Sequence, residues 1–327
     1  LGTTSFTADA TVNGVTVGKG ANSVSTNTVL GSSGLDASVT GGNNTAIGYD
    51  ALTTNTTGQA NSAVGSRCLE DTTTGSHNTA VGYQAMQLNT TASNNTAVGS
   101  GSLYDNTTGT RNTAVGAFAV ENNLSSDNTG IGYFALNANT TGQKNTAVGA
   151  IALDANTTAN YITAIGYNCL SNNTTGSNNT GVGRSALLAN ATGNNNTAVG
   201  FNALILNTGS SNTGCGTSAL ASNTSGNDNT VLGRNAMNGN TTGSQNTAIG
   251  ALALDANTSS SSNTAVGYSA LGANTTGQNN TGMGREAMAL NTTGQQNVAV
   301  GTYALDAATT ADNNTAIGFA ALGATTT

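Results

Sequence analysis

The segment Asn44-Thr45-Ala46-Ile47-Gly48 returns along almost the whole chain, next at residues 61–65 and 78–82 and for the last time at 314–318. Its glycine marks 18 copies, and successive glycines are 17 residues apart in fifteen intervals and 16 apart in two. Self-similarity at a fixed short period is the signature of a repeat architecture. A spacing this regular excludes disorder and predicts one structural coil per unit.

The full unit reads N-T-A-V-G-x-x-A-L-x-x-N-T-T-G-x-x. We number its positions from one to seventeen, starting at Asn44, and residues that share a position form a column. Position four is apolar in every copy, position nine is apolar and mostly Leu, and position eight is nearly always Ala. Seventeen residues are too few to bury a core alone, so stacked copies are expected to line up positions four and nine as internal ladders. The sequence predicts an all-β fold, a parallel β-solenoid or β-roll of about 18 coils.

Short strands fit the unit better than helices do, because each copy contains internal Gly and the turn-forming N-T-T-G. In a strand over positions two to four, Thr45 and Ile47 face one side and Ala46 faces the other. We expect the Thr and Ile side to lie inside the coil. The small position-three column is then expected to face outward, where it allows close packing of a second chain. The absence of Pro agrees with strands that are paired above and below.

The composition excludes several function classes. Asn, Thr and Gly together make 151 of 327 residues (49, 58 and 44), and the net charge is −7. Nucleic acid is not expected as a partner, because so few basic residues cannot neutralise a row of phosphates. No apolar run approaches the ~20 residues of a transmembrane helix, so membrane insertion is not expected either. Leu1 is not an initiator Met, and we expect any signal peptide to have been removed or to lie outside the given sequence.

The N-T-A-V-G-x-x-A-L repeat resembles the β-roll repeats of bacterial trimeric autotransporter adhesin heads. It resembles more closely the N-T-A-V-G-x-x-A-L-x-x-N-T-T-G shafts of proteins called tail-fibre-like. The resemblance covers residues 27–327, although the adhesin unit is somewhat shorter and no stalk, anchor or chaperone domain is recognised here. It implies a secreted fibre, on a cell surface or a virion, whose role is spacing or binding rather than catalysis.

Residues 1–26 stand outside the period and are predicted to form a strand or hairpin segment before the solenoid domain at 27–327. Apolar residues alternate with polar ones there, and Asn13-Gly14 is a strong hairpin-turn signal. This segment either caps its own chain or pairs with the last coil of the next subunit to build a filament. The candidate assembly residues are Phe6, Ala8, Ala10, Val12, Val15 and Val17.

Position twelve opens an N-x-[ST] sequon in most coils, which is the acceptor sequence for N-linked glycans. The candidate N-glycosylation residues are Asn55, Asn89, Asn106, Asn123, Asn139, Asn156, Asn173, Asn190, Asn223, Asn240, Asn257, Asn274 and Asn291. A second, less regular set follows an N-N-T pattern: Asn43, Asn94, Asn178, Asn195, Asn279 and Asn313. The alternative interpretation is that N-T-T-G is simply good turn chemistry.

No catalytic, cofactor-binding or metal-binding residues are predicted. Cys68 and Cys169 are expected to be small core residues about six coils apart, too far for a disulfide. The position-ten carboxylates Asp154 and Asp255 lie several coils apart, too far to share a catalytic site. Position six is an aromatic column interrupted by arginines, in which Arg184 and Arg285 are expected to stack on the rings of neighbouring coils.

The sequence therefore predicts a non-catalytic structural subunit of a fibre or filament, which assembles with copies of itself, a trimer among the possible forms. Glycans are the one expected covalent addition. Two alternatives stay open: a surface adhesin that binds a host glycan or receptor, and an ice-binding solenoid that uses the Thr column at position two. The ice-binding alternative requires these Thr side chains to face outward, against the expectation above.

Overall fold

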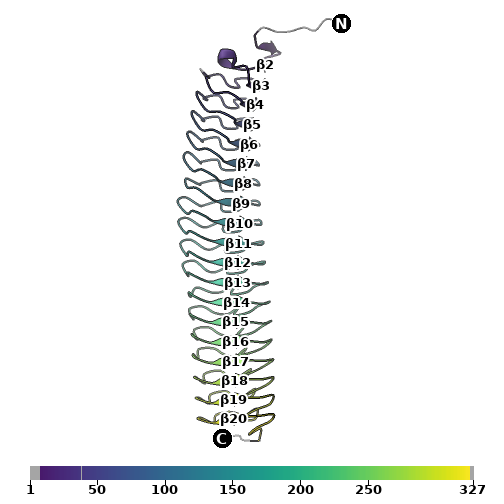
Figure 1. Ribbon diagram of the computed structural model, residues 1–327, viewed down its shortest axis with the longest axis vertical. Helices are drawn as coiled ribbons and strands as arrows, with labels where there is room; N and C mark the ends of the chain where they lie inside the picture. The colour runs from purple at the N-terminus through teal and green to yellow at the C-terminus, as the bar shows by residue number, and fades with distance from the viewer. Residues whose placement is uncertain (1–7, 38, 325–327) are drawn as a thin grey trace, which may run out of the picture. The chain divides into compact units, whose positions relative to one another are not determined.

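A computed structural model describes residues 8–37 and 39–324 of the chain. The fold is a parallel β-solenoid of about 17 turns with a 17-residue repeat, as predicted. Each coil contributes one three- or four-residue strand followed by turns, as Figure 1 shows. The chain divides into two compact units, Leu1–Tyr161 and Ile162–Thr327.

The strands of the first unit are β1 (Ala10–Val12), β2 (Val15–Gly18), β3 (Thr28–Gly31), β4 (Thr45–Ile47), β5 (Ser62–Val64), β6 (Thr79–Val81), β7 (Thr96–Val98), β8 (Thr113–Val115), β9 (Thr129–Ile131) and β10 (Thr146–Val148). One 3-10 turn, η1 (Ala21–Ser23), precedes β3. The strands of the second unit are β11 (Thr163–Ile165), β12 (Thr180–Val182), β13 (Thr197–Val199), β14 (Thr213–Cys215), β15 (Thr230–Leu232), β16 (Thr247–Ile249), β17 (Thr264–Val266), β18 (Thr281–Met283), β19 (Val298–Val300) and β20 (Thr315–Ile317).

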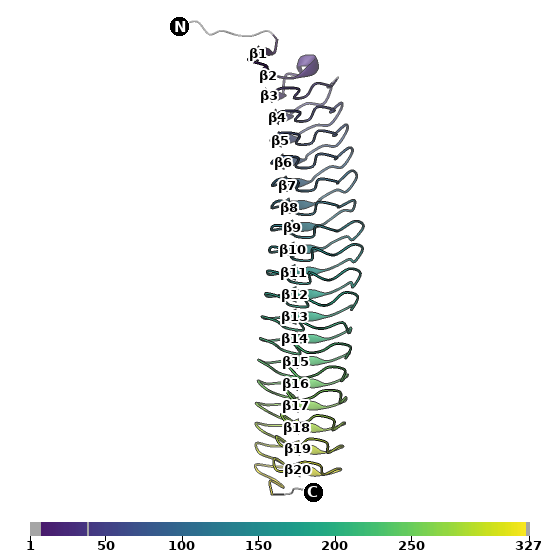
Figure 2. The same cartoon turned by 180° about the vertical axis from the view of Figure 1, so that it is seen from behind.

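Successive coils pair in parallel without any shift in register within each unit. Thr45 lies over Ser62, Ala46 over Ala63 and Ile47 over Val64, and the same alignment holds from β11 to β20. The two N-terminal strands form the predicted hairpin, with positive φ at Asn13 and Gly14, and β2 then pairs antiparallel with β3 of its own chain. Figure 2 shows this hairpin beside β3 at the start of the first unit.

The face of the strand that is buried is the opposite of the one expected. The position-three column, Ala46 in the reference coil, is buried, whereas the flanking Thr45 and Ile47 lie on the outer face. The predicted interior ladder at position nine is confirmed, since Leu52 and its counterparts are fully buried in all coils except the last described one. The coil is narrow, and the position-three side chains buried inside it are small: Ala or Gly in most coils, and Val at Val29 and Val231. Position four therefore turns outward, and the prediction that it forms a core ladder is wrong.

The other half of the interior is polar and is held by two asparagine ladders. At position one, Asn61 accepts the backbone N–H of Asn78 on Oδ1 (3.0 Å) and donates from Nδ2 to the carbonyl of Gly75 (2.8 Å). At position twelve, Asn240 donates to Asn223 Oδ1 (2.8 Å) and to the carbonyl of Gly243 (3.0 Å). Each coil thus satisfies buried polar groups of its neighbour, as buried donors and acceptors require.

The corners of the coil depend on unusual backbone conformations. Between the first and last coils the position-five glycines have φ near +135°, and a Cβ there would lie about 2.5 Å from the next coil's backbone, as at Gly65. Only glycine adopts this region readily. Positions seven, nine and seventeen are left-handed without being glycine, as at Asp50, Leu52 and Ala60. The stacked coils therefore hold their neighbours in conformations that an isolated repeat would not favour.

Candidate functional site

The outward face of the strands is a regular surface in each unit. Its two columns are position two, which is Thr in most coils, and position four, which is aliphatic with Cys215 and Met283 as variants. The position-four side chains are 37% exposed at Val64 and 49% exposed at Leu232. Neither column contains a charged residue in any coil. This face, which we call the strand face, presents hydroxyl and methyl groups at the spacing of parallel strands.

The thirteen candidate glycosylation residues at position twelve lie in the core, not on a surface. All of them are fully buried: Asn55, Asn89, Asn106, Asn123, Asn139, Asn156, Asn173, Asn190, Asn223, Asn240, Asn257, Asn274 and Asn291. Their side-chain amides belong to the interior ladder; Asn106, for example, donates to the carbonyl of Gly109 at 2.9 Å. A sugar on Nδ2 would have to replace this bond and occupy packed core volume. The expected position of this column on a surface turn, on which the glycan prediction depends, is therefore wrong.

The sequence pattern alone did not separate a surface turn from an interior ladder. Asn55 Oδ1 and Asn291 Oδ1 have no hydrogen-bond partner in the described part of the chain, because the next coils offer Thr72 and Ala308 where asparagine is usual. Asn is nearly invariant at position one, which is an available signal for burial, whereas at position twelve it is no more constant than the Thr at position thirteen.

The aromatic column at position six is exposed, as expected for a surface stack. Arg184 lies over Phe201 with its guanidinium 5.6 Å from the ring centroid. Arg285 lies between Tyr268 (5.9 Å) and Tyr303 (5.7 Å), and also pairs with Glu286 at 3.0 Å. These contacts confirm the predicted cation–π stacking for both arginines, with Tyr303 at position seven as an unforeseen partner. At Arg184 and Arg285 the column therefore contributes stacking between neighbouring coils.

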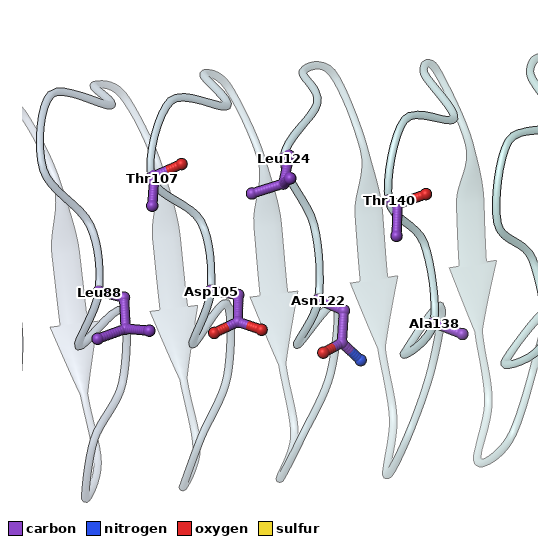
Figure 3. A pocket seen from close by; sticks show the side chains of 7 residues that line it. All are labelled: Leu88, Asp105, Thr107, Asn122, Leu124, Ala138 and Thr140. Carbon is purple, nitrogen blue, oxygen red and sulfur yellow. The ribbon is translucent and has the colours of Figure 1, made fainter.

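A shallow groove of about 460 Å³ runs along one side of the first unit between positions eleven and thirteen (Figure 3). Its lining residues are Leu88, Asp105, Thr107, Asn122, Leu124, Ala138 and Thr140. Burial raises the pKa of the Asp105 carboxyl. The groove contains Leu124 from one of the 16-residue coils, where Leu takes the place of the usual Thr. It is open and offers a single carboxylate, so it brings together no set of groups for catalysis.

The cysteines and carboxylates lie as separate single groups. Cys68 and Cys169 are buried core residues, as predicted, and burial raises the pKa of the Cys169 thiol to about 12. Desolvation also raises the pKa values of Asp154 and Asp255. Among residues 8–37 and 39–324, no three His, Cys, Asp or Glu side chains are grouped so that they could hold a metal ion.

The candidate assembly residues surround the N-terminal hairpin. Val12, Val15 and Val17 are exposed, as is Ala8, while Ala10 is half-buried. Phe6 lies outside the described residues. Because β2 pairs with β3 of the same chain, the hairpin covers its own first coil, which is the capping arrangement. The far edge of β1 has no partner strand in the part of the chain that the structure describes.

No protein-family model matches the sequence, and no curated protein matches it significantly. In the described residues no helix is both long and apolar enough to cross a bilayer. Function is therefore inferred from the geometry of the strand face and of the interior ladders.

Proposed function

We propose that this chain is a non-catalytic structural subunit of an extracellular fibre, on a cell surface or a virion, which assembles with copies of itself through the strand face. The observation that supports this most directly is the outward position of the aliphatic column at position four in coil after coil. Contiguous exposed apolar surface is rare on soluble monomers and marks interaction sites.

Charge distribution favours a second copy of the chain as the occupant of this face. The chain carries a net charge of −7, so contacts between copies through its charged surfaces are disfavoured. Both columns of the strand face are free of charge, so two copies can meet there without burying an unpaired ion. The resemblance to trimeric adhesin heads and to tail-fibre-like shafts agrees with such an assembly, and the closed form that it suggests is a trimer.

The N-terminal hairpin provides a separate contact for growth along the fibre. Its β1 strand presents an unpaired edge next to Val12, and unpaired edges readily accept another strand. We propose that this edge accepts a strand of a neighbouring subunit.

Lysines on the strand face are expected to disperse the assembly. The triple variant Val81→Lys, Val98→Lys and Val115→Lys places three charges on neighbouring coils of that face. Because an unpaired buried charge costs several kcal/mol, we expect the apparent association constant to fall by at least about 100-fold. Analytical ultracentrifugation should show multiples of 31.9 kDa for the wild type and single chains for the variant.

The matched control introduces the same three charges on an exposed turn column, as Thr74→Lys, Thr91→Lys and Thr108→Lys. This control should assemble as the wild type does. Thiol labelling provides a second readout, because Cys215 lies on the strand face while Cys68 and Cys169 are buried. We expect Cys215 to be protected in the assembly and reactive in the dispersed variant. A wild type that sediments as single chains at tens of micromolar would refute the proposal.

Ice binding is the second candidate, and the outward Thr column favours it. Thr180, Thr197 and their counterparts stand in register at about the 4.8 Å spacing of paired strands, beside a methyl-rich column. The sequence-based expectation that these hydroxyls lie inside the coil argues against ice binding, and that expectation is wrong. A flat, uncharged and regular surface of this kind suits an ordered water lattice.

Thermal hysteresis distinguishes the two candidates. If the strand face binds ice, the wild type should lower the freezing point without lowering the melting point, and Thr180→Tyr with Thr197→Tyr should abolish the effect. The matched control Thr175→Tyr with Thr192→Tyr alters an exposed turn column of the same coils and should retain it. Absence of hysteresis in dispersed single chains would remove this candidate and leave the fibre proposal untouched.

A further inference from the structure

The solenoid divides its sequons into two groups that differ in exposure. In the coil that begins at Asn78, Asn89 at position twelve is fully buried, and Asn94 at position seventeen is exposed. The other N-N-T asparagines of position seventeen are exposed as well: Asn43, Asn178, Asn195, Asn279 and Asn313. The same acceptor sequence therefore occurs inside and outside one coil, five residues apart.

Position seventeen is a rigid corner that directs its side chain away from the coil. Asn94 has a left-handed backbone (φ 62°), which asparagine tolerates better than most residues. Its backbone N–H donates to the carbonyl of Ser76 in the preceding coil at 3.0 Å, and the equivalent bond from Asn195 to Ser177 is 3.1 Å. The backbone is thereby held in place, while the side-chain amide takes part in no hydrogen bond among the described residues.

The third residue of each exposed sequon lies on the outer surface too. Thr96 follows Asn94 at the sequon spacing and stands on the strand face, because the intervening Asn95 is the residue that points into the core. An enzyme that approaches the corner from outside thus meets both the acceptor amide and the threonine hydroxyl. Asn172 differs: it is exposed, but the hydroxyl of its Thr174 donates to the carbonyl of Ala191 at 3.1 Å.

We propose that Asn43, Asn94, Asn178, Asn195, Asn279 and Asn313 are sites of N-linked glycosylation on the folded chain. The donor is a lipid-linked oligosaccharide pyrophosphate, and the catalyst is an oligosaccharyltransferase that accepts folded substrates. Asparagine Nδ2 forms a bond to C1 of the sugar, the bond from C1 to the pyrophosphate oxygen breaks, and the lipid pyrophosphate leaves. The proton from Nδ2 passes to a base of the transferase. The product in each unit carries glycans beside the strand face.

The test uses the full folded chain, a purified single-subunit oligosaccharyltransferase and a lipid-linked oligosaccharide, with sites mapped by mass spectrometry. A synthetic peptide of residues 86–97 contains both Asn89 and Asn94 and reports their intrinsic reactivity. We expect both to be modified in the peptide. In the folded chain Asn94 should react at least about a hundredfold faster than Asn89, because the buried Asn89 amide becomes accessible only when its coil unfolds locally.

Two results would overturn the proposal. One is an unmodified Asn94 in the folded chain under conditions that modify it in the peptide. The other is equal modification of Asn89 and Asn94 with the circular dichroism spectrum of the solenoid retained. The variant Asn94→Gln should remove one glycan mass and leave those on Asn178 and Asn195 unchanged. Glycan occupancy is read independently of sedimentation, so this test and the assembly test fail separately.

Discussion

Replacing Gly99 by alanine is expected to destabilise the first unit by about 2–6 kcal/mol. Its φ is +135°, where a side chain costs of order 1–3 kcal/mol in strain alone. An added Cβ would also lie 2.5 Å from the carbonyl oxygen of Gly116 and 2.6 Å from its carbonyl carbon. Because this obstacle is backbone in the next coil, relief requires shifting a stacked strand, which adds a cost of the size seen for overpacked cores, typically 1–3 kcal/mol.

Denaturant unfolding followed by circular dichroism gives the free energy of unfolding, and amide hydrogen exchange locates the damage. The loss should be largest in the coils next to residue 99, because a solenoid is stabilised mainly by nearest-neighbour contacts. Ser100→Ala is the matched control, since it alters the adjacent residue without a positive-φ requirement, and it should stay within ~0.5 kcal/mol of the wild type. An equally stable Gly99→Ala variant would mean that the glycine corner tolerates a Cβ.

Converting Asn196 to aspartate is expected to cost about 3–5 kcal/mol at neutral pH. Asn196 is fully buried and donates from Nδ2 to the carbonyl of Gly209 at 2.9 Å, while its Oδ1 accepts the N–H of Asn212 at 2.9 Å. The aspartate loses the donor and places a carboxylate in the core next to a carbonyl oxygen. A broken buried charge arrangement typically costs this much.

The defect should be partly reversed by acid, and the sign follows from linkage. Burial raises the pKa of the introduced carboxyl in the folded state above its value in the unfolded chain. Folding is then penalised above the folded-state pKa, and stability returns as pH falls toward the unfolded value near 3.9. Asn195→Asp is the matched control next in sequence, at an exposed left-handed corner where Asp127 and Asp228 occur naturally. It should show neither the loss nor the recovery.

The sequence predicts the wrong buried face for the strand at positions two to four, and three expectations are wrong for this reason. The apolar character of position four predicts burial, yet the side chains of Val64 and Val98 lie on the outer face of the coil and that of Ala63 lies in its interior. The Thr column at position two likewise lies on the outer face, and the small-residue column at position three lies in the interior. A strand of three residues has two faces, and hydrophobicity cannot choose between an inner face and an outer face that binds another chain.

The asparagine ladders show a second limit of the sequence. The N-x-[ST] sequon at Asn55 and its column predicts glycans on a surface, and the alternative interpretation of N-T-T-G is a turn. In the structure these side chains donate to carbonyls that the narrow coil has turned inward, as Asn55 does to Gly58 at 3.1 Å. Whether an asparagine serves a turn or a core depends on where neighbouring coils place unpaired carbonyls, and a single repeat does not reveal this.

The sequence by itself determined the period, the strand at positions two to four, the N-terminal hairpin at Asn13-Gly14 and the buried Leu column. These features follow from local rules, since turn residues, β-branched residues and fixed spacing act within one or two coils. Only the tertiary structure decided which strand face is buried, which sequons are exposed and why Leu52 adopts a positive φ. Each of these depends on stacking of the coils. A single coil has no buried interior, because its backbone groups find their hydrogen-bond partners in the neighbouring coils and its side chains pack against theirs.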